Sequence, residues 1–179
     1  MRAKLFIPLT MLVALLPSRP AGASTGTAGQ TLTATVTPVG ALTAPGTAVL
    51  TTSSTTFQPF TVTVPLNYQI RTTPVGSGAI TLEVTSDFTP SGGPAAASGS
   101  LTYVCSGANL GTPCSGTQTA STTSQTPVLS VPASTCTGGG GVCSGQNPNS
   151  MNITFTLANN PVYPTGSYSA NVTFTISAM

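Results

Sequence analysis

Ionisable side chains are scarce in this sequence. Its 179 residues contain four Lys or Arg, two Asp or Glu, and no His. Three of the four cations lie within the first 19 residues, so residues 24–179 retain only Arg71, Glu83 and Asp87. A chain with a single cation cannot neutralise a phosphate backbone. Nucleic acid and anionic lipid are therefore excluded as expected partners.

The same scarcity argues against catalysis and metal binding. If Glu83 and Asp87 lie on one strand, their side chains stand about 13 Å apart, whereas a glycosidase needs two carboxylates at about 5 to 9.5 Å. Without His, and with no Lys after residue 4, no ordinary base is present to activate a serine or threonine. Two carboxylates cannot build a calcium cage. We expect no catalytic residue, no metal site and no cofactor, and hence no enzyme.

The N-terminus carries an export signal. Arg2 and Lys4 precede an apolar run from Leu5 to Leu16, and Ala21-Gly-Ala23 follows. A basic start, an apolar run too short to span a bilayer and an A-x-A site predict a signal peptide, residues 1–23, cleaved after Ala23. We expect the product to be secreted or on the cell surface, reached through the periplasm in a Gram-negative cell. No second apolar anchor follows, so we expect no membrane insertion after cleavage.

Residues 24–179 predict one folded all-β domain. Apolar residues alternate with Ser, Thr or Asn, the pattern of strands with one buried face, and we found no helical apolar period. The strongest runs are Thr31–Thr37, Phe60–Ile70, Ile80–Phe88, Met151–Leu157 and Tyr168–Ala178. Weaker strands are expected at Gly46–Thr51, Leu101–Cys105 and Val128–Val131, and residues 89–98 read as a linker. The expected fold is an immunoglobulin-like antiparallel β-sandwich of about seven or eight strands.

Two hairpins are expected from the order of these runs. The first folds at residues 158–167 and pairs Ile153 with Val172 and Phe155 with Ala170. The second folds at residues 73–78, pairs Ile70 with Leu82 and Tyr68 with Val84, and places Arg71 diagonal to Glu83. Such an exposed ion pair contributes about 0 to 1 kcal/mol. Pro65 lies within the run Phe60–Ile70, so that run lies at a sheet edge, bulges or breaks.

Four cysteines border or lie within a Gly/Ser/Thr-rich region, residues 106–145: Cys105, Cys114, Cys136 and Cys143. In an exported chain they predict two disulfides, and their spacing is not that of a zinc site. The local pairs, Cys105 with Cys114 and Cys136 with Cys143, are favoured. Each contributes about 2 to 3 kcal/mol in the chain-entropy model. The nested alternative pairs Cys105 with Cys143 and Cys114 with Cys136.

Tyr163 is the aromatic residue most expected to be exposed, because it lies in the proline-containing loop before the last strand. It is the candidate for contact with a sugar or a partner, although single exposed apolar residues are normal and packing within its loop is the favoured interpretation. The sequons at Asn152 and Asn171 fall inside expected strands. We interpret them as products of Thr-rich alternation.

The last strand and the turn before it, Pro164-Thr-Gly-Ser-Tyr-Ser-Ala-Asn-Val-Thr-Phe-Thr-Ile-Ser177, resemble the closing strand of the spore coat protein U and archaic chaperone-usher pilin group. The resemblance implies an immunoglobulin-like sandwich that lacks one strand and is completed by the N-terminal strand of the next subunit in a fibre. It also implies a periplasmic chaperone and an outer-membrane usher as partners.

Edge chemistry points the same way. β-sandwiches commonly protect their edge strands with lysines and inward charges, and residues 24–179 contain no lysine. Residues 24–40 carry a candidate donor strand whose apolar side is Leu32, Ala34 and Val36. The sequence therefore predicts a structural subunit of an extracellular fibre, pilus or coat that forms homopolymers by β-strand addition. The alternative is a secreted carbohydrate-binding or surface-binding module.

Overall fold

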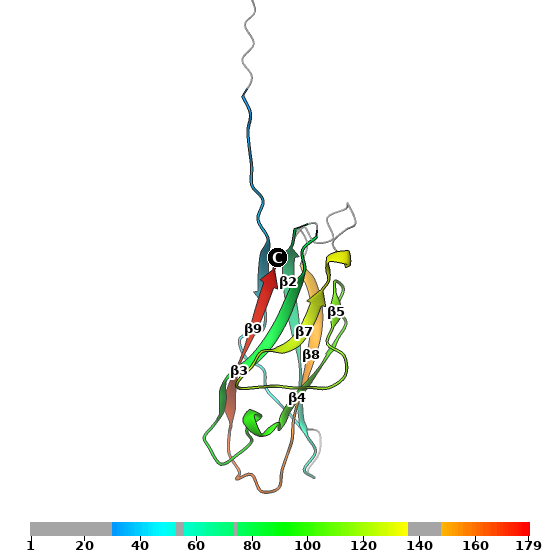
Figure 1. Cartoon of the computed structure of the whole chain (residues 1–179). Coiled ribbons are helices and arrows are strands. Elements are labelled where there is room, and N and C mark those ends of the chain that lie inside the picture. The colour runs from blue at the N-terminus through cyan, green and yellow to red at the C-terminus, as the bar shows by residue number, and fades with distance from the viewer. Residues whose placement is uncertain (1–29, 53–55, 74, 136–147) are drawn as a thin grey trace, which may run out of the picture. The chain divides into compact units, whose positions relative to one another are not determined.

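The computed structural model describes residues 30–52, 56–73, 75–135 and 148–179. The chain divides into two units, residues 1–34 and 35–179. In the first unit the described residues are 30–34, and they adopt no regular secondary structure. The expected signal peptide lies outside the described residues. All described strands belong to the second unit, which is called the domain below (Figure 1).

The domain is built from two antiparallel sheets (Figure 1). Sheet A has the order β1-β2-β8-β4-β6, and sheet B has the order β5-β7-β3-β9. The strands of sheet A are β1 Val39–Thr43, β2 Phe60–Arg71, β8 Asn149–Leu157, β4 Leu101–Ser106 and β6 Gln118–Thr119. Those of sheet B are β5 Thr112–Pro113, β7 Thr126–Val131, β3 Gly78–Thr89 and β9 Ser169–Ala178. Two short 3-10 helices, η1 Ala96–Ser98 and η2 Ala133–Thr135, complete the described elements.

Both sheets contribute to one hydrophobic core. Alternate residues of the long strands point inward, as the sequence pattern predicts, and many are almost fully buried. The largest fully buried side chains are Tyr68, Tyr103, Leu66, Ile70, Ile80, Leu82, Met151, Ile153, Val84, Val128 and Val131. The buried tyrosine hydroxyls have partners in other elements, because Tyr68 donates to the Leu110 carbonyl and the Tyr103 hydroxyl lies 2.8 Å from the Pro127 carbonyl oxygen. The prediction of an all-β fold with one apolar core is confirmed.

The predicted C-terminal hairpin is wrong. β8 pairs with β2 and β4, so Ile153 lies opposite Val64 and Cys105 and not opposite Val172. β9 lies in the other sheet, where Val172 pairs with Val84. Phe155 pairs with Val62 and Tyr103, so its expected pairing with Ala170 is also wrong. The residues between β8 and β9 are numerous enough to cross from sheet to sheet, which brings the two apolar faces together across the core.

The second predicted hairpin fails for the same reason. β2 belongs to sheet A and β3 to sheet B. Ile70 pairs with Gly40, Tyr68 with Leu42 and Asn149, Leu82 with Phe174 and Thr126, and Val84 with Val172. Arg71 and Glu83 therefore do not form the expected cross-strand pair. Alternation in a sequence identifies the buried face of a strand, but it does not identify the neighbouring strand.

Pro65 lies within a continuous β2, opposite Asn152 of β8, at a stretch that has no partner on the β1 side. Thr61 exchanges two backbone hydrogen bonds with Thr51, at 2.8 and 3.1 Å. Because backbone groups alternate along a strand, the nitrogen of Pro65 faces the same side as the N–H of Thr61. On that side the β1 pairing ends at Asn67, so no β1 residue pairs with residue 65. None of the three expected outcomes holds for the whole run, because β2 lies between β1 and β8 and pairs with β8 without a break or a register shift. The proline is accommodated because its nitrogen faces the side where β2 locally has no partner.

The N-terminal strand boundaries differ from those predicted. Residues 31–38 form no strand within the chain, whereas Val39–Thr43, which contains a glycine, forms β1 against β2. The expected strand Gly46–Thr51 is also wrong, because only Thr51 bridges to Thr61. Pro45 and Gly46 interrupt the ladder that β1 begins. Six strands were predicted within about two residues of their observed bounds: β2, β3, β4, β7, β8 and β9.

Residues 89–98 are more ordered than a linker. The peptide bond between Thr89 and Pro90 is cis, and η1 follows at Ala96. Asp87 accepts three backbone N–H bonds, from Phe88 at 2.7 Å, Ala96 at 2.7 Å and Ala97 at 3.1 Å. One carboxylate at the end of β3 therefore fixes both the start of this loop and its helical turn.

Candidate functional site

Strand β9 has the least protected edge in the domain. Each sheet has two outer strands, β1 and β6 in sheet A and β5 and β9 in sheet B. β5 and β6 are two residues long, and β1 has five residues between Pro38 and Pro45. β9 has ten residues without a proline or a charged side chain. Proteins ordinarily shorten, charge or interrupt their edge strands, and β9 shows none of these features.

The backbone of β9 presents alternate polar groups at this edge. Met179 donates its N–H to the Ser77 carbonyl at 2.9 Å, on the side of β3. Because the direction of backbone groups alternates, residues 172, 174, 176 and 178 direct their N–H and C=O groups away from β3. Within the described part of the chain, no strand pairs with β9 on that side. We call this side the β9 edge.

The core is incompletely covered along the β9 edge. Five inward residues of β9 are only partly buried: Ala170, Val172, Phe174, Ile176 and Ala178. Their neighbours on β3 are fully buried, since Ile80, Leu82 and Val84 are at most 1% exposed. Phe60 and Val62, at the start of β2, are also partly buried. An unpaired backbone and a partly exposed apolar row therefore coincide on the same strand.

β1 approaches only one part of β9. A Cβ added to Gly40 would lie 2.9 Å from Ile176 Cγ1, so the two strands approach closely there. After Thr43 the chain loses strand geometry until Thr51, and Val49 in this stretch is 74% exposed. Figure 1 shows β9 alongside β3, with the C-terminus at the end of β9.

The candidate donor residues make no strand in their own chain. Leu32 is 88% exposed and Val36 is 70% exposed, and Ala34 between them is also exposed. Exposure at 32, 34 and 36 leaves one apolar side without cover. Their alternation is that of a strand with one buried face, although residues 31–38 form no such pairing here.

The Cys105–Cys114 disulfide is confirmed. The sulfur atoms are 2.05 Å apart, and the bond joins β4 of sheet A to the residue after β5 of sheet B. Cys114 also donates its N–H to the Val128 carbonyl at 2.9 Å. The nested pairing is therefore wrong, whereas Cys136 and Cys143 lie outside the described residues. The loop between Cys105 and Cys114 is short, and the disulfide that closes it joins the two sheets covalently.

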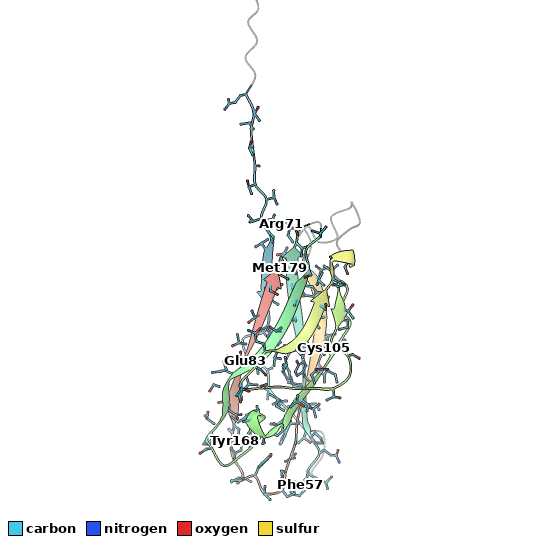
Figure 2. All side chains as sticks on the ribbon, in the orientation of Figure 1. Phe57, Arg71, Glu83, Cys105, Tyr168 and Met179 are labelled. Atoms are coloured by element: carbon cyan, nitrogen blue, oxygen red, sulfur yellow. A yellow bond between two sulfur atoms is a disulfide. The ribbon has the colours of Figure 1, made fainter. Side chains whose placement is uncertain are left out.

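Tyr163 is not the most exposed aromatic residue. It is half-buried, and its N–H donates to the Asn160 carbonyl at 3.0 Å. Phe57 is 62% exposed and has a positive φ of 24°. Nothing in the sequence indicated this exposure, because Phe57 lies in a Ser/Thr-rich loop with no alternating pattern. Figure 2 shows Phe57 and Tyr168 at the end of the domain opposite Arg71 and Met179.

Residues that flank Phe57 in the sequence contribute to the lining of an open hollow. It has a volume of about 360 Å³ and is lined by Thr51, Thr52, Gln58, Pro59, Thr61 and Thr156. The Gln58 carbonyl accepts hydrogen bonds from Thr52 Oγ1 at 3.3 Å and from Asn159 Nδ2 at 3.1 Å. These two bonds connect the chain segments that contain the three residues. Every lining side chain is uncharged. This hollow can offer hydrogen bonds to a neutral ligand but no ionic contact.

Other site types find no support in the described ranges. They contain no cluster of three or more His, Cys, Asp or Glu placed to hold a metal. Among these same residues, no helix has the length and hydropathy needed to cross a bilayer. Asn152 and Asn171 are exposed but lie within β8 and β9, as expected.

Known proteins provide no assignment. No family model matches the chain, and no curated protein shows significant similarity to it.

Proposed function

We propose that this protein is a structural subunit of an extracellular fibre, pilus or coat, and that subunits assemble by β-strand addition at the β9 edge. One observation carries the proposal: the longest edge strand lacks charges and prolines and also bears the incompletely covered side of the core. An added strand would pair with the free backbone groups of β9 and cover its apolar row. Both effects favour occupancy of the edge.

The sheet order supports an immunoglobulin-like arrangement that lacks its last strand. An immunoglobulin constant domain has sheets A-B-E-D and C-F-G. Lettering β1, β2, β3, β4, β8 and β9 as A to F gives A-B-E-D in one sheet and C-F in the other. The position of strand G, beside strand F, corresponds to the β9 edge. Strands β5, β6 and β7 are an addition between D and E.

The occupant that we propose is the segment carrying Leu32, Ala34 and Val36 from another copy of this chain. Three apolar side chains at alternate positions match the alternation of an inserted strand. Because they are exposed in their own chain, they are available to a neighbour. A periplasmic chaperone and an outer-membrane usher are proposed as the partners that handle the β9 edge before assembly.

Truncation tests this function. Residues 24–179 and 39–179 should be compared at equal concentrations by sedimentation and electron microscopy. We expect the longer chain to form polymers that grow with concentration, and the shorter chain to remain a folded monomer. A peptide of residues 24–38 should bind the shorter chain and protect the β9 amides from hydrogen exchange. Polymers formed by residues 39–179 would refute the donor role.

A second function has one specific observation in its favour. The uncharged hollow and the exposed, positive-φ Phe57 suit a neutral saccharide, with hydroxyl contacts to the threonines and an apolar contact to the ring. An array of neutral glycans should then retain the wild-type domain and release Phe57→Ala. Val162→Ala, which alters another exposed apolar side chain, is the control and should bind normally. Equal binding by both variants would exclude this site.

A further inference from the structure

Arg71 holds the chain just before β1. It is the last residue of β2 and pairs with Val39, the first residue of β1. Its Nε donates a hydrogen bond to the Thr37 carbonyl oxygen at 2.9 Å. Thr37 lies two residues before Val39, so the side chain reaches the diagonal position on the neighbouring segment. Figure 2 shows Arg71 at the same end of the domain as Met179.

Thr37 lies where the ladder between β1 and β2 stops. Pro38 has no N–H and cannot extend the ladder. A residue that precedes proline is restricted to extended backbone geometry, so Thr37 has little freedom to turn. The guanidinium group therefore supplies one further cross-strand hydrogen bond beyond the last backbone pair. Thr37 is exposed, and this bond is the contact that ties it to β2.

The chemistry of Arg71 suits this hydrogen bond to the Thr37 carbonyl. The guanidinium is always charged and presents N–H donors in fixed directions, whereas a lysine ammonium has none at the Nε position. Glu83 and Asp87, the other charged residues after residue 23, lie on β3 in the other sheet. Among the described residues, the one cation is thus used on a backbone carbonyl at the base of the N-terminal segment.

We propose that Arg71 is a positioning residue that sets the boundary of the donated segment. The proposal rests on the proposed function. Residues up to Val36 are given to a neighbour, whereas Thr37 stays tied to its own domain. The hinge between consecutive subunits then begins next to Thr37 and not at Val39. A shorter hinge restricts the angle between subunits and stiffens the fibre.

Arg71→Met tests the boundary, because methionine keeps an unbranched side chain but has no donor. In the monomer, nitrogen-15 relaxation should show the order parameters of residues 35–37 falling below about 0.6, the range of flexible backbone. In fibres, electron micrographs should show a shorter persistence length with an unchanged amount of polymer. Glu83→Gln also changes the net charge by one unit, although in the opposite direction and in the other sheet, and should match the wild type in both measurements.

The outcomes separate the two proposals. Unchanged order parameters at residues 35–37 in Arg71→Met, with wild-type fibres of normal stiffness, overturn the role of Arg71 and leave strand addition intact. Failure of the wild-type chain to polymerise overturns strand addition, and with it the role of Arg71 between subunits. The monomer measurement still reports, in that case, whether the hydrogen bond to Thr37 orders the chain.

Discussion

Gly40 of β1 lies against Ile176 of β9, at the place where the two sheets approach each other beside the β9 edge. A Cβ at residue 40 would meet Ile176 Cγ1 at 2.9 Å, Cγ2 at 3.0 Å and Cδ1 at 3.1 Å. Both γ carbons of this branched side chain face residue 40, so a Cβ there would require Ile176 to change its χ1 rotamer or β1 to shift. Glycine therefore fits here because of the close approach of a neighbouring side chain.

We predict that Gly40→Ala destabilises the domain. Overpacking costs about 1 to 3 kcal/mol, which exceeds the roughly 0.5 to 1 kcal/mol gained by replacing a strand glycine. Gly46→Ala is the matched control, because no atom lies within 4 Å of the added Cβ. Urea unfolding should show a lower midpoint for Gly40→Ala only. Equal midpoints would mean that β1 shifts without cost.

The second prediction concerns the disulfides. Replacing Cys105 and Cys114 together by alanine should lower the free energy of unfolding by about 2 to 3 kcal/mol, because the closed loop is short. Urea denaturation of the oxidised protein is the measurement. Non-reducing peptide mapping of the wild type should also find Cys136 linked to Cys143. A free thiol at either of those two residues contradicts the second local pair.

The third prediction is loss of stability in acid through Asp87. Burial alone raises the pKa of this carboxyl, but hydrogen bonds from the N–H groups of Ala96, Phe88 and Ala97 outweigh it and leave the pKa below its ordinary value of 3.8. A lowered folded-state pKa stabilises the fold above the unfolded-state value, and this stability disappears as the pH falls through the folded-state value. Stability should therefore decline as the pH drops below about 4.

Asp87→Asn isolates this effect. The variant lacks the charge that the three N–H groups bind, so its stability should be lower at neutral pH and should change less on acidification. Glu83→Gln, which removes a carboxylate outside that hydrogen-bond cluster, serves as the control. Thermal unfolding at several pH values between 2 and 7, as rough limits, compares the variants. An acid response of Asp87→Asn equal to that of the wild type would show that another group is responsible.

The alternating residues of β2, β3, β8 and β9 predicted which side chains are buried, because a strand with one covered face has a period of two. They could not predict the partners, since Val64 and Val172 are equally suitable neighbours for Ile153 by polarity alone.

β1 was missed because its glycine, alanine and leucine form no alternating run, and only the contact with Ile176 explains the glycine. The local disulfide was predictable from the sequence separation of 9 between its cysteines and from the expectation of export. The Arg71 bond to Thr37 has no signal in the sequence, because it depends on which strand becomes the neighbour of β2.

The fourth prediction compares two positions in the candidate donor segment. Val36→Asp should prevent assembly and leave monomer unfolding unchanged, because Val36 is 70% exposed in its own chain. In a neighbour's core the carboxylate would be buried without a partner, at a cost of several kcal/mol. Thr35→Asp places the same charge on the opposite side and should still assemble. Sedimentation of both variants at equal concentration is the measurement, and equal loss in both would indicate general charge repulsion.

The last prediction tests the β9 edge through its backbone. Residue 172 directs its N–H away from β3, so Val172→Pro removes a donor that the domain itself does not use in the β3 ladder. Val172→Ala is the matched control, because it also shortens the partly buried side chain but keeps the N–H. Both variants should lose a similar amount of monomer stability, about 1 to 2 kcal/mol in urea unfolding. Only Val172→Pro should fail to form polymers, since the incoming strand loses a hydrogen bond and meets the proline ring. Polymer yields that are equal for the two variants would show that the β9 edge takes no part in assembly, whatever the role of residues 24–38.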